Sequence, residues 1–348
     1  MEKVNHIKVN FIELVLFPML LFGYPVVFYL FPVINILPYP IVQFSCGIVL
    51  CYFLAKKKNL KIQRTVVTYL LILLIMTAIY TVVHFDKVYY SQFIVIILVL
   101  IGFLAVYNFL GIRDFVDIYV KSIMLIGIGG MISFLLVMLF HLSPIFEYEN
   151  MDSRPGYFFG LTCTNTYMGS FIRYAGIFDE PGAMGFWGIF AIIMNKLIFN
   201  NRKIEYILIV TLSLTFSLAF YIQIIVLKIG ENIKSIKKIL LFSIISILTI
   251  IFLASLEHSK EYFAIWQLTL GRLEKNDSGE FSGDNRSELM DITKPVFLDN
   301  PIFGVGASNL AEMSEKRFIG GNPFTPLARD GILGTIAVYL FVIPIFSR

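Results

Sequence analysis

Apolar runs of about twenty residues constrain the fold of this chain more than any other feature of its sequence. A transmembrane helix needs roughly 20 apolar residues to cross a hydrocarbon core of about 30 Å. Six runs are long enough, and two shorter candidates accompany them; they lie at 11–32, 65–84, 92–111, 122–141, 182–200 and 239–257, with the shorter ones at 40–55 and 331–346. With 57% hydrophobic and 15% charged residues, the composition is unlike that of a soluble globular domain. We therefore predict an all-α integral membrane protein, a single polytopic domain over 1–348.

The basic residues predict which side of the membrane each loop faces. They gather in short loops at 56–64, 196–203 and 228–238, and Arg113 and Lys121 fall between two further spans. Cytoplasmic loops carry an excess of lysine and arginine, so these loops are predicted inside, with an uncleaved first span. The formal net charge of +4 lies mostly in these loops and does not indicate a nucleic-acid partner.

One apolar run, 204–227, does not fit as a single span. Read as one helix, it would place the basic loop at 228–238 outside, against the bias of lysine and arginine toward the inside. We expect the run to enter and return, with a turn near Thr215-Phe216-Ser217, as a pair of short or re-entrant segments. With this pair, the prediction is about ten transmembrane helices. Irregular backbone at that depth is tolerated where it lines a wet cavity, so a cavity is expected nearby.

Two long segments, about 142–181 and 258–325, are then predicted on the outer face. They hold most of the remaining charged residues. In the second segment, apolar residues between Arg286 and Phe297 have helical spacing, which predicts a short amphipathic helix with Asp284 as its N-cap and a bend at Pro295.

Each outer segment carries an arginine whose role is open at this stage. In the first, Pro181 suits the first position of a helix and Asp179 or Glu180 suits its cap, but neither explains Arg173, which is either a headgroup anchor or a site residue. In the second, Arg286 at a helix start and the Gly304-Val305-Gly306 turn are parts from which phosphate sites are built. The alternative is a surface arginine and an ordinary turn.

Four motifs in order resemble the O-antigen polymerase and O-antigen ligase superfamily of bacterial envelope glycosyltransferases. They are the Arg173-Tyr-Ala-Gly-Ile-Phe-Asp-Glu-Pro-Gly stretch, the Leu214-to-Phe220 turn, the segment from Ser282 to Gly306, and Gly331-Ile-Leu-Gly334. The resemblance covers most of the chain from about residue 142 onward. Before it, only the hydropathy matches.

The resemblance implies a metal-independent inverting glycosyltransferase at the outer face of the bacterial cytoplasmic membrane. The donor would be an undecaprenyl-pyrophosphate-linked oligosaccharide, and no cofactor is expected. The expected partners are membrane lipid and a chain-length regulator. Arg173 and Arg286 stand at the positions of the pyrophosphate ligands, and Glu180 is our candidate general base. The predicted substrate-binding set is Arg272, Tyr174, Asp179, Gly304, Gly306 and Asn309.

Departures from the family pattern favour the polymerase branch. Ligases usually carry a histidine before the last span, whereas the stretch from Gly320 to Thr325 has none; His6, His84, His141 and His258 lie outside the motifs and are expected to be interfacial or surface residues. The chain ends at Arg348 after one more span, where relatives commonly continue, so it is either a short member or lacks its carboxy terminus.

Two rivals remain from other classes. A lipid flippase or other transporter fits the composition and topology, but its path should show ionisable residues at mid-span, and the predicted spans hold almost none. The other rival is a structural membrane subunit without activity. The sequence leaves the sugar, the linkage and the polysaccharide class open.

Overall fold

The computed structural model describes residues 64–86, 88–89, 112–149, 154–233, 235–259, 263–275, 286–313, 322 and 324–339. These residues cluster into two compact units. The first unit covers the described residues from 112 to 275, and the second brings 64–89 together with 286–339, which is far away in the sequence. Three predicted spans, 11–32, 40–55 and 92–111, lie outside the described residues.

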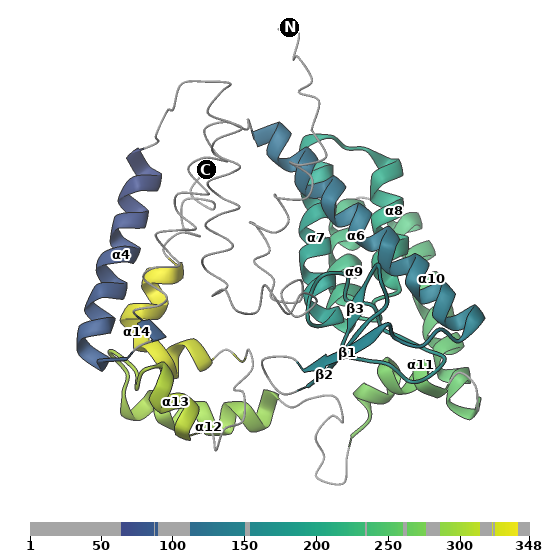
Figure 1. Cartoon of the computed structure of the whole chain (residues 1–348). Helices are drawn as coiled ribbons and strands as arrows, with labels where there is room; N and C mark the ends of the chain where they lie inside the picture. Colours follow the sequence, from purple (N-terminus) through teal and green to yellow (C-terminus); the bar gives the residue numbers. More distant parts are fainter. Residues whose placement is uncertain are drawn as a thin grey trace, which may run out of the picture. The chain divides into compact units, whose positions relative to one another are not determined.

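Within the described residues, the core of the first unit is a group of packed helices (Figure 1). Helix α6 packs against α7 and α8, and α7 also packs against α8 and α9. Helices α7 and α8 approach closely because Gly188 of α7 faces Leu212 of α8. A Cβ added at Gly188 would lie 2.4 Å from Leu212 Cδ1. The bounds are α6 Ile112–Phe140, α7 Pro181–Ile198, α8 Arg202–Ser213, α9 Leu218–Asn232, α10 Ile236–Ser255, η2 Leu256–His258, α11 Phe263–Leu268 and η3 Leu270–Leu273.

Helix α6 begins well before the apolar run predicted at 122–141. Arg113 and Lys121, which we placed in a loop, belong to its first turns. The ammonium of Lys121 pairs with Asp117 one turn earlier at 2.5 Å, and the Arg113 guanidinium lies 5.5 Å from the centre of the Phe199 ring. Hydropathy located the apolar part of the helix but not its first residue, because the polar residues before the apolar run continue the same backbone hydrogen bonding.

The predicted turn within 204–227 is confirmed. Helix α8 ends at Ser213 and α9 begins at Leu218, with Phe216 in the left-handed region at φ +48°. Ser217 caps α9, since its hydroxyl accepts a hydrogen bond from the N–H of Phe220 at 3.3 Å. At 1.5 Å per residue the two helices are about 18 and 22 Å long, shorter than a hydrocarbon core of about 30 Å.

The segment predicted as the first outer loop contains a small antiparallel sheet, which the sequence did not predict. Its strands are β1 (Phe146–Glu149), β2 (Pro155–Phe158) and β3 (Cys163–Thr164), in the order β1-β2-β3. Phe146 faces Phe158 across the first pair, and Tyr157 faces Thr164 across the second. Strands of four residues or fewer are too short to show a clear alternating pattern.

The second unit packs helix α14 (Thr325–Tyr339) against α4 (Arg64–His84), α12 (Arg286–Asp299) and α13 (Ala307–Met313). The short helix predicted from Arg286 is confirmed as α12, and it continues through Pro295 to Asp299. Asp284, its predicted N-cap, lies outside the described residues.

Helix α14 is broken at Gly331, whose φ of +63° and ψ of −170° belong to a region that is open essentially to glycine alone. The loop after α12 satisfies the backbone groups that the break releases. The carbonyls of Ala328 and Arg329 accept hydrogen bonds from the N–H groups of Val305 and Gly306, both at 3.0 Å. Beyond the break, the N–H of Ile332 donates to the carbonyl of Pro301 at 2.8 Å. The break is therefore part of the packing of the second unit.

Two helices in the described part of the chain are long and apolar enough to cross a membrane, Arg113–Phe140 and Pro181–Ile198. The apolar helix Leu71–His84 is shorter. Ten transmembrane helices therefore stay a prediction.

Candidate functional site

Arg173 lies in an extended segment that is tied to β3. Its carbonyl accepts a hydrogen bond from the Thr164 hydroxyl, and its N–H donates to the carbonyl of Thr166 at 3.3 Å. The flanking side chains of Ile172 and Tyr174 are fully buried. The backbone of Arg173 is thus fixed by both hydrogen bonding and packing.

The guanidinium of Arg173 reaches the turn between α8 and α9. Its Nε donates to the carbonyl of Thr215 at 3.2 Å, and its Nη2 donates to the carbonyl of Phe216 at 2.9 Å. These carbonyls follow the carboxyl end of α8, where a positive charge is favourable. The residue keeps only 7% of its surface exposed, so Arg173 is no headgroup anchor at the protein surface. It holds the turn.

The charge of Arg173 lies close to other ionisable groups of the first unit. Burial, and after it the positive charge of Arg272, lower the pKa of Arg173 to about 10, while Glu180 and Tyr221 act in the opposite direction. The guanidinium is still charged at neutral pH. The tertiary structure therefore brings Arg173, Arg272 and Glu180 together, although almost a hundred residues separate Arg173 from Arg272 in the sequence.

Glu180, and not Asp179, occupies the N-cap position of α7. Its backbone is extended, with φ −141° and ψ 150°, and Pro181 follows as the first helical residue. The Glu180 side chain makes no capping hydrogen bond. Its Oε2 lies 3.5 Å from Arg154 Nη1, and about half of each side chain is exposed. Of the two residues predicted as candidates for the cap, Glu180 therefore holds the position, and its carboxylate is not used for capping.

Tyr174 supports the site from behind. Its ring is fully buried and its hydroxyl donates to the carbonyl of Thr211 in α8. On its other side α6 comes so close that a Cβ added at Gly130 would lie 2.2 Å from Tyr174 Cδ2. A side chain without accessible surface does not touch a substrate, so the predicted contact is replaced by a packing role.

The other predicted site residues belong to the second unit. Arg286 begins α12, and its side chain lies outside what the structure describes. The N–H of Gly304 donates to the carbonyl of Asn300 at 3.0 Å, and the N–H of Gly306 is bound to α14. Neither N–H is available to a phosphate, so this glycine turn does not form the phosphate site that the sequence suggested. These glycines are needed for close approach, because a Cβ at Gly304 would lie 2.4 Å from the Arg329 carbonyl group.

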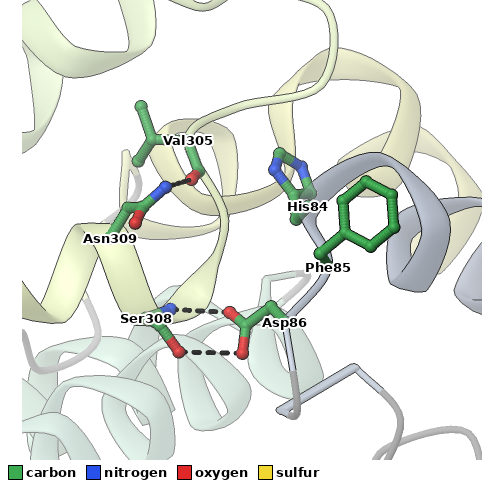
Figure 2. A pocket seen from close by; sticks show the side chains of 6 residues that line it. All are labelled: His84, Phe85, Asp86, Val305, Ser308 and Asn309. Carbon is green, nitrogen blue, oxygen red and sulfur yellow. Dashed lines mark hydrogen bonds between the residues drawn. The ribbon is translucent and has the colours of Figure 1, made fainter.

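Asn309 lines a cavity of the second unit together with His84 and Asp86, at the end of α4 (Figure 2). His84 was expected to be an interfacial or surface residue, and neither Asp86 nor Arg154 was predicted as a site residue. The sequence His84-Phe85-Asp86, with two polar residues at the end of an apolar run, could have indicated the cavity. Nothing in the spacing of Arg154 and Glu180 predicts their contact.

The cluster of Arg154, Arg173, Glu180 and Arg272 has three positive charges and one negative charge. An arginine offers five N–H donors in a planar fork, and the hydrogen bonds to the turn use two groups of Arg173. Such a cluster is suited to an anion with several oxygens. Among the described residues, no group of three or more histidine, cysteine, aspartate or glutamate side chains is arranged to hold a metal ion.

No family model, no curated protein and no solved structure matches this chain.

Proposed function

We propose that the chain is a polysaccharide polymerase of the outer face of the bacterial cytoplasmic membrane. It transfers an oligosaccharide repeat from undecaprenyl pyrophosphate onto another lipid-linked repeat, without a metal ion. The observation that carries the proposal is the buried, turn-bound guanidinium of Arg173, which lies close enough to Arg272 and Glu180 for their charges to change its pKa.

The chemistry of such a transfer matches this cluster. The hydroxyl of the acceptor sugar forms a bond to the anomeric carbon of the donor, and the bond from that carbon to the pyrophosphate oxygen breaks. The leaving pyrophosphate gains negative charge, which arginines oriented beforehand stabilise. The hydroxyl proton goes to a base, for which we propose Glu180. Its carboxylate is half exposed and not used in capping. General-base catalysis contributes about 10²–10⁴-fold.

The deciding experiment is performed in the source bacterium. Deletion of the gene should collapse the polysaccharide ladder on a gel to single repeats, and the wild-type gene should restore it. Arg272→Ala is the informative variant, because Arg173 also holds the α8–α9 turn. We expect Arg272→Ala and Arg173→Lys to shorten the ladder. Arg202→Ala, an exposed arginine at the start of α8, is the matched control.

A full ladder in both Arg272→Ala and Arg173→Lys would refute the proposal. Accumulation of long polymer that is not ligated would indicate an O-antigen ligase, and lipid-linked repeat trapped on the inner face would indicate a flippase. For the base, Glu180→Gln keeps the size of the side chain but does not accept a proton. Full polymer length in Glu180→Gln would exclude a base role.

A further inference from the structure

The cavity of the second unit has a volume of about 260 Å³, and two distant segments of the chain line it. It is lined by His84, Phe85, Asp86, Val305, Ser308 and Asn309. Pockets for drug-sized ligands have about 300–1,000 Å³. This cavity is smaller and has the size of a single sugar ring.

Asp86 fixes the cavity wall by joining the two segments. Its Oδ2 accepts a hydrogen bond from the Ser308 N–H at 2.8 Å, and its Oδ1 accepts one from the Ser308 hydroxyl at 2.8 Å. Figure 2 shows both bonds. Burial alone would raise the pKa of the Asp86 carboxyl, but hydrogen bonds from Val88 and Ser308 lower it below its ordinary value. The carboxylate is ionised at neutral pH, and the wall is held by charge-assisted bonds.

Phe85 places an aromatic ring at the cavity in a left-handed backbone conformation. Its φ is +49°, and 88% of its surface is exposed. The left-handed conformation is common for the residue that follows a helix, and Phe85 directly follows α4. Its exposed ring is accessible to a ligand at the cavity.

The polar groups of the cavity favour a neutral ligand with several hydroxyl groups. Asn309 Nδ2 donates to the carbonyl of Val305 at 2.9 Å, and its amide oxygen has no hydrogen bond within the described residues. His84 Nε2 is bound to the carbonyl of Phe303 at 3.1 Å, so this nitrogen carries the proton. The described lining includes no lysine or arginine. It therefore offers acceptors and an aromatic face, which suit hydroxyl groups.

We propose that this cavity is a subsite for one sugar ring. Phe85 covers the apolar face of the ring, and Asp86, Ser308 and Asn309 contact its hydroxyl groups. Its assignment to the saccharide substrate rests on the proposed polymerase function. The subsite lies wholly within the second unit and is separate from the arginine cluster of the first.

Saturation-transfer NMR on the purified full chain in detergent tests the subsite directly. The probes are the methyl glycosides of glucose, galactose, rhamnose, N-acetylglucosamine and N-acetylgalactosamine, with glycerol 3-phosphate standing in for a lipid headgroup. The key variant is Phe85→Gly, which removes the ring and also suits the left-handed backbone. We expect at least one glycoside to bind the wild type. Phe85→Gly should weaken it about tenfold and leave the unfolding temperature no lower than that of the wild type.

Two further variants control for the loss of an aromatic ring. Phe85→Trp keeps an aromatic face and should keep binding, and Phe140→Ala removes a ring that is 67% exposed in the first unit and should change nothing. The subsite is refuted if no glycoside binds, if Phe85→Gly binds as well as the wild type, or if glycerol 3-phosphate binds in preference to every glycoside. Loss of detergent or bilayer binding in Phe85→Gly with unchanged sugar binding would show a membrane anchor, which also overturns the proposal.

The polysaccharide ladder separates this proposal from the previous one. A wild-type ladder together with no sugar binding removes the subsite and leaves the polymerase. Sugar binding that depends on Phe85, with a ladder that is unchanged by gene deletion, removes the polymerase and leaves a sugar site.

Discussion

Replacing Arg173 by alanine should open the α8–α9 turn locally. The change removes two hydrogen bonds from a charged donor to the carbonyls of Thr215 and Phe216, at 3.2 and 2.9 Å. A hydrogen bond with a charged group contributes about 1.5–3 kcal/mol, so the two together contribute about 3–6 kcal/mol. Relief from burying a charge near Arg272 opposes this loss. We expect a net loss of about 3 kcal/mol in the free energy of opening, or about a hundredfold in its equilibrium constant.

Cys163 provides the assay, because it lies in the strand to which the Arg173 segment is bound. Its N–H donates to the carbonyl of Gly176 at 2.7 Å, its side chain is buried, and burial raises the pKa of its thiol to about 12. The folded thiol therefore reacts with a maleimide at pH 8 only after local opening. With Cys46 and Cys51 changed to serine, Cys163 is the only thiol in the chain. Arg173→Ala should be labelled about a hundred times faster than this parent.

Two variants complete the comparison. Arg173→Lys keeps the charge but not the planar fork, so its labelling rate should lie between those of the parent and Arg173→Ala. Arg202→Ala removes an exposed arginine of the same unit and should change the rate by no more than about twofold. If Arg173→Ala reacts within about threefold of the parent rate, the two hydrogen bonds do not hold the turn and the reasoning fails.

Two further predictions test the packing around each candidate site. Gly331→Ala should destabilise the second unit by at least about 3 kcal/mol, since the left-handed φ is unfavourable and the new Cβ would lie 2.3 Å from the Ile302 carbonyl oxygen. Gly230→Ala in α9 meets nothing within 4 Å and should be neutral or stabilising; similar unfolding midpoints for the two variants would contradict the account. Tyr174→Phe should lower the free energy of unfolding by about 1 kcal/mol, because only the hydrogen bond of the buried hydroxyl is lost. The KM for lipid-linked repeat should not change. A raised KM with unchanged stability would instead place Tyr174 in the binding surface.

Hydropathy and local capping signals predicted a large part of the helical structure. The helices α4, α7 and α10 follow the apolar runs closely, and Pro181 begins α7 as its fixed φ suggests. The turn near Phe216 was also predicted, because the bias of basic loops forbids a single span there. These features depend on neighbouring residues or on the distribution of lysine and arginine among the loops, and both can be read from the sequence.

The small sheet and the break at Gly331 were not predicted. Strands β1 to β3 are too short to show periodicity. The break in α14 depends on hydrogen bonds from Val305 and Gly306, which come from another part of the chain. The same contacts explain why the Gly304-Val305-Gly306 turn was misread, since a glycine needed for close packing and one needed for phosphate binding look alike in a sequence.

For the candidate site, the sequence by itself determined which side chains are available: arginines in the two long charged segments, and a glutamate before Pro181. Only the tertiary structure decided that Arg173 reaches the turn after α8, that Arg272 lies near it, and that the Glu180 side chain meets Arg154 and makes no capping hydrogen bond. It likewise decided that Asp86 binds Ser308 and so builds a cavity beside Phe85. The physical reason is the range of the interactions: periodicity and capping act over a few residues, whereas hydrogen bonds and charges act through space between segments that only folding brings together.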